Sequence, residues 1–100
     1  MAEHGWEVER ALLGGLMLDP SQMGEVTERI AADAFSRPPH ANLFTLLVTI
    51  QEQGSRGDIV SVMDEIGRRN ADDFDGIAYV AAMPSACPSV ENLVVYADRI

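Results

Sequence analysis

The stretch EVERALLGGLMLDP, residues 7–20, decides the fold of this 100-residue chain. Its apolar residues recur at the i, i+3, i+4 spacing of one helix face: Val8, Ala11, Leu12, Gly15 and Leu16. Trp6, Leu13 and Met17 make the opposite side apolar too, which is typical of a helix enclosed by other elements. Gly14 and Gly15 each cost about 1 kcal/mol relative to Ala inside a helix, which indicates either a closely approaching backbone or a local weak point. We expect this helix to be the hub of the fold.

Helical spacing and cap residues predict the helices that pack on the hub. The expected ranges are about 20–32, 38–53, 59–67, 77–83 and 90–100, with Asp19, Ser36, Asp58 and Ser89 as N-caps. Between the second and third helices, Phe35 is expected to be buried in the core. Pro38 and Pro39 fall in the first turn of the third helix, where their missing N–H groups cost nothing. Gly54 is expected to end that helix, and Pro84 to stop the fifth.

No stretch alternates apolar and polar residues over the length of a strand. The sequence therefore predicts an all-α fold, a compact bundle of about five to six short helices without a sheet. One hundred residues are enough for one hydrophobic core, so we expect a single helical domain over residues 1–100.

The charge of the chain excludes several functions. Sixteen acidic residues oppose seven basic ones, giving a formal charge of −9, and no basic stripe is visible. Such a chain repels phosphate backbones, so we expect no direct binding to nucleic acid. All seven basic residues are Arg. Without Lys, the chain cannot supply a Walker A lysine, a Schiff-base lysine or a Ser-Lys dyad.

The compartment predicted from the sequence is the cytoplasm. Cys87 is a single cysteine, which excludes an internal disulfide. The N-terminal residues lack the basic and apolar regions of a secretion signal. No apolar run reaches the ~18 residues of a membrane span, so no membrane association is expected.

No combination of side chains predicts a catalytic or metal site. His4, His40 and Cys87 are too scattered for a structural zinc site, which needs four ligands at short spacings. His40 is expected to be a partly buried histidine that is hydrogen-bonded at the start of a helix. Cys87 lies between Ala86 and Pro88 without an activating neighbour, so we interpret it as a small hydrophobic thiol.

Two acidic or adhesive motifs also have simple interpretations. Asp72, Asp73 and Asp75 lack the spacing and the bidentate Glu of a calcium loop, so a solvated acidic connector is expected. The tripeptide at 56–58, RGD, is explained by a loop, a turn glycine and the helix cap Asp58. The site prediction is therefore negative: catalytic residues none, cofactor-binding residues none, metal ligands none.

The last helix carries the prediction of an interface. The chain ends inside an amphipathic helix without a stop signal, so we expect Ile100 to be an artificial boundary. Val95 falls well off the inward face of this helix, where missing chain or a partner could cover it. We expect Val94, Val95 and Arg99 to contact a partner or a neighbouring subunit.

Five ordered segments match the pattern of one family. They are 11–20 (ALLGGLMLDP), Phe35 with 40–44 (HANLF), 57–62 (GDIVSV), 75–80 (DGIAYV) and 88–100 (PSVENLVVYADRI). From Glu7 to Ile100 the chain resembles the N-terminal domain of the DnaB-type replicative DNA helicase. The corresponding family elements read V-L-G-x-L-L-L-D-P, H-x-x-I-F, V-D-x-x-T-V, G-G-x-x-Y-L and P-S-x-x-N-x-x-x-Y-A. The chain departs at Gly57, where the family often has Val or Ile, and at Asp75, where it often has Gly.

The resemblance implies a helical domain in the collar of a hexameric helicase ring. ATP and Mg belong to a separate C-terminal motor domain that is absent here, so no cofactor is expected in this chain. A helical hairpin that pairs neighbouring domains normally follows the last helix. The implied partners are primase and other replisome proteins. We therefore expect an assembly and docking domain for DNA replication that is non-catalytic by itself and is a monomer or weak dimer when isolated.

Two alternatives belong to other classes of protein. One is the helicase-binding C-terminal region of a DnaG-type primase, whose helical fold is similar. This lineage is expected to lack the ordered H-x-x-L-F and P-S-x-x-N-x-x-x-Y-A elements. The other is an unrelated small enzyme that uses Asp or His, for which turnover of a nucleotide or an ester by the purified chain would be evidence.

Overall fold

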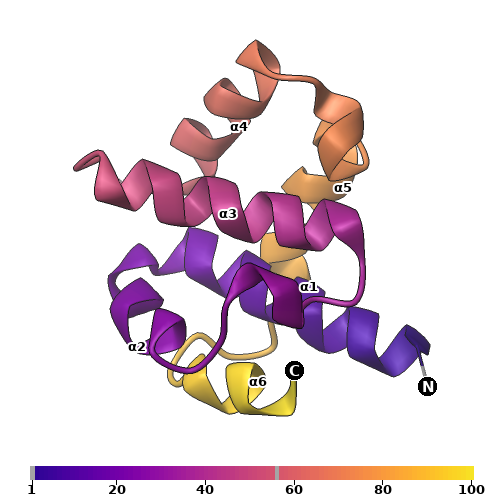
Figure 1. The fold of residues 1–100 in the computed structure, drawn as a ribbon, viewed down its shortest axis with the longest axis vertical. Coiled ribbons are helices and arrows are strands. Elements are labelled where there is room, and N and C mark those ends of the chain that lie inside the picture. The colour runs from indigo at the N-terminus through magenta and orange to yellow at the C-terminus, as the bar shows by residue number, and fades with distance from the viewer. Residues whose placement is uncertain (1, 56) are drawn as a thin grey trace.

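The computed structural model describes residues 2–55 and 57–100, with side chains from residue 5 onward. The regular elements among these residues are all helices, without a strand in the described ranges. The α-helices are α1 (Ala2–Leu18), α2 (Met23–Thr27), α3 (Pro38–Glu52), α4 (Ile59–Arg68), α5 (Ile77–Ala81) and α6 (Val94–Arg99) (Figure 1). The 3-10 helices are η1 (Pro20–Gln22), η2 (Ala32–Ala34), η3 (Ala71–Phe74) and η4 (Met83–Ala86). The all-α prediction is confirmed.

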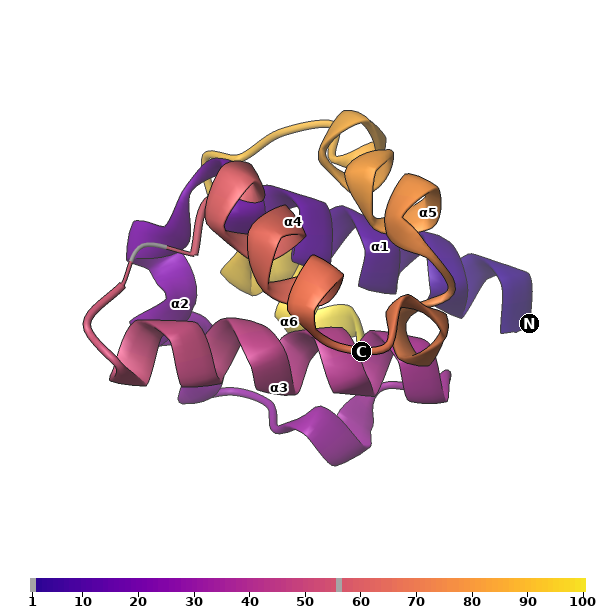
Figure 2. The same ribbon diagram turned by 90° about the horizontal axis from the view of Figure 1, so that it is seen from above.

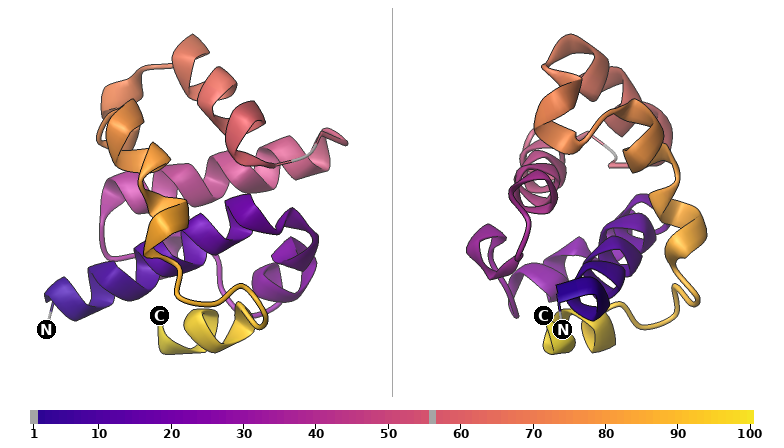
Figure 3. Two further views of the ribbon diagram at one scale, coloured as in Figure 1. Left: turned by 180° about the vertical axis from the view of Figure 1, so that it is seen from behind. Right: turned by 90° about the vertical axis from the view of Figure 1, so that its right-hand side faces the viewer.

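The helices surround the pair α1 and α3, which lie side by side through the middle of the molecule (Figures 1 and 2). Helix α4 lies over the seam between them, with α5 beside it (Figure 2). Helices α2 and α6 cover the other side of α1. Both chain ends lie toward the α6 end of the molecule, opposite α4 (Figure 3). No helix of the described part is long and apolar enough to cross a membrane.

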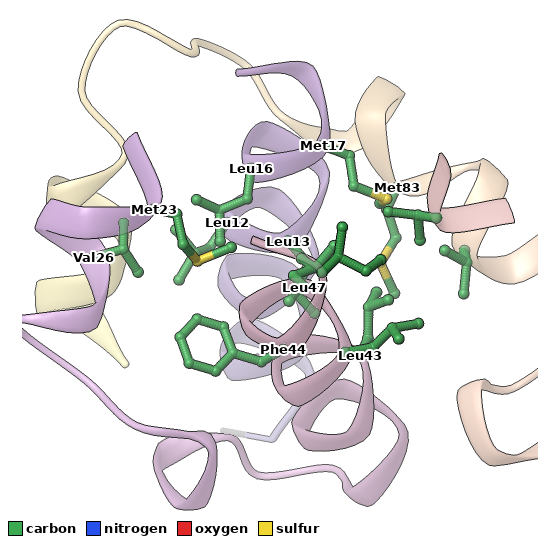
Figure 4. Packing of buried hydrophobic residues seen from close by; sticks show 14 of the residues in the cluster. Leu12, Leu13, Leu16, Met17, Met23, Val26, Leu43, Phe44, Leu47 and Met83 are labelled. Carbon is green, nitrogen blue, oxygen red and sulfur yellow. The ribbon is translucent and has the colours of Figure 1, made fainter. Parts of the chain in front are cut away.

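Helix α1 is the predicted hub. Leu12, Leu13 and Leu16 are completely buried, and their side chains meet residues from both flanks of the fold (Figure 4). The core they share also contains Met17, Met23, Val26, Leu43, Phe44, Leu47, Val62, Ile66, Val80, Met83 and Leu93. Fully burying one side chain of this size contributes about 1.5–3 kcal/mol, so these three leucines together contribute several kcal/mol to stability.

Gly14 and Gly15 of α1 mark a close approach of η4 and of the connection that follows it. A Cβ added at Gly14 would lie 2.0 Å from the carbonyl oxygen of Met83, which is a backbone atom. At Gly15 the nearest atoms would be Leu93 Cδ2 at 2.5 Å and Cys87 Sγ at 3.0 Å. Of the two interpretations of these glycines, the close approach is therefore the correct one at Gly14, and at Gly15 the approach is by side chains.

The start of α3 differs in part from the prediction. Pro38 and Pro39 occupy the first turn as expected, and Gly54, with φ of +82°, follows the end of the helix. Ser36 is not the N-cap. Arg37 holds that position without a side-chain cap, and the backbone N–H of Ser36 donates instead to the Glu9 carboxylate. The predicted cap of α4 is confirmed: the Asp58 carboxylate accepts the N–H of Ser61 at 3.0 Å.

Helix α2 is shorter than predicted. The Val26 carbonyl accepts the N–H groups of both Arg29 and Ile30, at 2.9 and 3.1 Å, and this shared bond closes the helix. Ala31 then adopts an extended conformation with φ −120° and ψ 175°. Ile30 still packs on the core, but from this extended segment rather than from a helix. Phe35 is buried, 7% exposed, as predicted.

The C-terminal part also differs from the predicted helices. Helix α5 ends at Ala81, and Pro84 lies in the first turn of η4 rather than ending a helix. Helix α6 begins at Val94, so the expected Ser89 cap is wrong. The Gln22 side chain explains the delay, because its amide donates to the Val90 carbonyl and accepts the Leu93 N–H at 2.9 Å. These bonds hold residues 87–93 as a non-helical connection.

Candidate functional site

The predicted interface residues lie on α6, and one of them, Arg99, borders a hollow. Val95 is 44% exposed, Arg99 is exposed and Val94 is partly buried. A surface hollow of about 390 Å³ lies between parts of α1, η4 and α6 and is lined by Glu7, Val8, Ala11, Ala86, Pro88, Tyr96 and Arg99. The structure thus places Arg99 beside a surface depression and Val95 in solvent. Their contact with a partner stays a prediction.

His40 is at the centre of a buried polar network. It is fully buried rather than partly buried, and it lies in the first turn of α3 as predicted. Its Nδ1 lies 2.6 Å from Oε1 of Glu9, which is itself 3% exposed. The other Glu9 oxygen accepts the Ser36 N–H at 2.8 Å. Both carboxylate oxygens are therefore satisfied, as a buried carboxylate requires.

The hydrogen bonds of Tyr79 fix the tautomer of His40. His40 Nε2 lies 2.8 Å from the Tyr79 hydroxyl, which accepts a hydrogen bond from Arg37 Nη1 at 3.0 Å. The hydroxyl proton is then free to be donated to Nε2, and Nδ1–H is donated to Glu9. When His40 is neutral, each hydrogen-bonding group in the series from Glu9 through His40 and Tyr79 to Arg37 has a partner. Burial lowers the pKa of His40 below its ordinary value, although the Glu9 carboxylate opposes this change.

The network reaches the surface at Arg37. Its guanidinium pairs with Asp75, lies 4.6 Å from the centre of the Trp6 ring and 5.6 Å from that of Tyr79. Arg10 covers the Tyr79 ring at 5.4 Å. Trp6 is 38% exposed. Cation–π contacts of this kind contribute about 0.5–1 kcal/mol at exposed sites. The network therefore ties α1, the start of α3 and the start of α5 to one another.

Asp75 differs from its predicted role, and Tyr79 shows why two of the segments that match the family lie together. Asp75 is not simply a solvated connector residue, because it pairs with Arg37. Its φ of 66° and that of Gly76, 94°, are left-handed, which accounts for the Gly-Gly of the family pattern at this point. Two matching segments, HANLF and DGIAYV, thus meet in space through His40 and Tyr79.

Glu9 is the network residue that sequence reasoning missed. A signal for it existed, because Glu9 lies three residues after Trp6 and four before Leu13, on the same apolar side of α1. A carboxylate on such a stripe needs a buried partner. Which residue supplies that partner could not be predicted, since His40 is 31 residues away.

The remaining candidates for chemistry are not assembled into a site. Within the described residues, no three His, Cys, Asp or Glu side chains are placed to hold a metal. Cys87 Sγ donates to the Ser89 carbonyl at 3.2 Å, and burial raises the pKa of its thiol. This favours the unreactive thiol that we predicted. The side chain of His4 and all of Arg56 lie outside the described residues.

Comparison with known proteins identifies the family of this helical fold. The family described as the DnaB-like helicase N-terminal domain matches residues 1–100. The chain belongs to this family. The replicative DNA helicase DnaB of Treponema pallidum is 37% identical over 93% of the chain, and that of Haemophilus influenzae is 31% identical over 97%. The chain spans about a fifth of the length of these helicases, 22% and 21% respectively.

A solved structure confirms the family fold. The N-terminal domain of DnaB helicase from Mycobacterium tuberculosis aligns with a TM-score of 0.85 and 29% identity, over 92% of this chain and 67% of that one. The family assignment decides against the alternative of a primase domain. The match is to one domain of a replicative DNA helicase.

Proposed function

We propose that this DnaB-like domain is the assembly and docking domain of a hexameric replicative helicase in the cytoplasm, and that it contacts primase and other replisome proteins. The observation that carries the proposal is the match of the helicase N-terminal domain family over residues 1–100. The proposal includes that the domain is non-catalytic by itself. ATP and Mg would bind in the remainder of a full-length helicase.

The physical character of the domain supports a role in protein binding. Its most buried titratable groups, Glu9 and His40, are hydrogen-bonded to each other between α1 and α3. Because both are buried, a substrate cannot reach them. Exposed apolar side chains remain on the surface at Leu18, Val60 and Val95, 52%, 74% and 44% exposed. The formal charge of −9 disfavours contact with DNA phosphates and favours partners with basic surfaces.

Deletion of residues 1–100 from the full-length helicase tests the proposal. We expect the truncated protein to lose primase binding in a pull-down and to form less stable rings in sedimentation velocity, while it keeps nucleotide hydrolysis. The isolated domain should sediment as a monomer or weak dimer. Nucleotide turnover by the isolated domain, or a stable hexamer of it, would contradict the proposal.

A further inference from the structure

An apolar groove runs along the outer side of α3, on the α2 side of the molecule. Its volume is about 340 Å³, and it is lined by Thr27, Ile30, Ala31, Ala32, Phe44, Thr45, Val48, Thr49 and Glu52. The α3 members of this lining fall on one stripe of the helix. Residues 44–52 span about 12 Å of helix axis, which is the length of roughly two helical turns. The groove is therefore long enough for a short segment of another protein.

The lining of the groove is less polar than its residue names indicate. The Thr27 hydroxyl donates to the Gly24 carbonyl at 3.0 Å, and the Thr49 hydroxyl donates to the Thr45 carbonyl at 2.9 Å. Because these hydroxyls are bonded to their own helices, the methyl groups remain for the groove. Phe44, 2% exposed, belongs to the core below. The groove thus offers an apolar surface to solvent.

The early end of α2 creates this groove. Had the helix continued to residue 32, Ile30 and Ala31 would have packed as helical residues. Instead the extended segment at Ala31 forms the far wall. An adjoining hollow of about 380 Å³, lined by Met23, Gly24, Thr27, Val48, Gln51 and Glu52, extends the groove along α2. A Cβ at Gly24 would meet no atom within 4 Å, so this end is open.

The elements that form the groove are acidic. Glu25, Glu28, Asp33 and Glu52 are all exposed on them. Arg29 is the basic residue of the same segment, and its guanidinium is paired with Asp98 at 3.0 Å. Glu52 lines the groove itself, and the other three carboxylates lie on the elements that form it, on a chain whose formal charge is −9. A second copy of the chain would bring the same negative charge to it.

We propose that this groove docks a short segment of a partner protein that carries one or two aliphatic or aromatic anchors beside lysine or arginine. The inference rests on the proposed function of the domain in partner docking and assigns a place and a chemistry to it. Apolar anchors fill the lining between α3 and Ala31, and the basic side chains pair with Glu52 and with exposed carboxylates of the surrounding elements.

Selection from a displayed library of random 12-residue peptides tests the groove without a known partner. The wild-type domain should enrich peptides that combine apolar anchors with Lys or Arg. The best peptides are then synthesised, and their affinity is measured by fluorescence anisotropy against two matched pairs of variants. Thr49→Arg fills the groove, whereas Ala81→Arg adds the same charge on the exposed surface of α5. Glu52→Gln and Glu91→Gln each remove one exposed carboxylate, at the groove and away from it.

We expect Thr49→Arg to weaken peptide binding about tenfold or more and Ala81→Arg to leave it unchanged. Glu52→Gln should weaken binding several-fold and make it less sensitive to salt, unlike Glu91→Gln. Arg has a higher helix propensity than Thr, so Thr49→Arg should fold, which circular dichroism checks. Failure to enrich any peptide, enrichment of peptides without basic residues, or equal binding by the groove variant would overturn the inference.

Two further measurements separate this inference from the proposed function. If the wild-type domain dimerises in sedimentation and Thr49→Arg abolishes the dimer, the occupant is a second copy and the inference is wrong. If primase binds the wild type and Thr49→Arg equally while no peptide binds the groove, the inference fails and the proposed function stands. If primase does not bind even the wild type, the proposed function fails, whatever the peptides do.

Discussion

Oε1 of Glu9 and Nδ1 of His40 lie 2.6 Å apart inside the domain, although the two residues are 31 positions apart in the chain. Both side chains are buried, and the second Glu9 oxygen holds the backbone of Ser36. This contact joins the central helix α1 to the start of α3. A buried carboxylate is costly without partners, so the pair is better understood as fixing one arrangement of the helices than as a source of net stability.

The first prediction concerns the partners of Glu9. In Glu9→Gln, with His40 in the tautomer that donates from Nδ1, the amide turns an N–H group toward either His40 or the Ser36 N–H, so one buried donor loses its acceptor. We expect the free energy of unfolding to fall by about 1–3 kcal/mol in urea titrations. Glu7→Gln, two residues earlier and exposed, is the control and should change stability by less than about 0.5 kcal/mol. Equal stability of the two variants would contradict the network.

The second prediction concerns the titration of His40. Burial lowers its pKa, so the folded protein releases the proton of His40 more readily than the unfolded chain does. The neutral, buried His40 therefore stabilises the folded state fully at pH values above the unfolded pKa of about 6.5. This stabilisation is lost as the pH falls from about 6.5 through the lower pKa of the folded state. An NMR titration of the imidazole should give a pKa below that of a free histidine. A raised pKa for His40 would show that the charged form is the stable one.

Asp19 titrates in a separate pH range. Hydrogen bonds from the Gln22 and Ser21 side chains lower the pKa of Asp19. The ionised Asp19 therefore stabilises the folded state at pH values above its unfolded pKa, and this stabilisation is lost as the pH falls through its lower folded pKa. Because the ordinary pKa of an aspartate is about 3.9, this loss occurs at more acidic pH than that of His40. The NMR titration of individual groups therefore distinguishes the two.

The third prediction compares two helical glycines. In Gly14→Ala the new methyl would lie 2.0 Å from the Met83 carbonyl oxygen, so α1 and η4 must separate. We expect a loss of stability of about 2 kcal/mol or more, despite the higher helix propensity of Ala. Gly67 in α4 has open space around the same position, so Gly67→Ala should stabilise the domain by about 0.5–1 kcal/mol. Thermal unfolding of both variants measures the difference in sign.

The fourth prediction concerns Gln22, which holds the connection before α6. In Gln22→Glu the side chain can no longer donate to the Val90 carbonyl, although it can still accept the Leu93 N–H. We expect faster amide hydrogen exchange in residues 87–93 and a loss of stability of about 1 kcal/mol. Ser21→Ala, which keeps the Gln22 bonds, should leave the exchange of Leu93 unchanged. Unaltered exchange in Gln22→Glu would mean that the connection is held by other contacts.

The sequence was sufficient to predict those features of the fold that depend on the spacing of nearby residues. The stripe of α1, the prolines of α3 and the Asp58 cap of α4 are local features, and all were predicted correctly. The predicted second and last helices were wrong in extent for non-local reasons. Helix propensity at 90–93 is overridden by the Gln22 amide, whose bonds reach across 68 and 71 residues. Such a contact leaves no periodic signal in either segment.

In the candidate sites too, local features were predicted and contacts between distant segments were not. The position of His40 in the first turn of α3 was predicted from the sequence, although not its complete burial, whereas its Glu9 and Tyr79 partners depend on how three elements meet. The groove along α3 was not predicted, because it exists only where α2 ends early. The interface at Val94, Val95 and Arg99 remains a prediction. A charge reversal, Arg99→Glu, tests it by its effect on primase binding.

Isothermal titration of purified primase from the same organism into the isolated domain tests the central claim most directly. A docking domain should give saturable binding with defined stoichiometry, weakened by salt because the chain is strongly acidic. Absence of binding by the folded domain, together with unchanged primase binding by a full-length helicase from which residues 1–100 were removed, would contradict the claim.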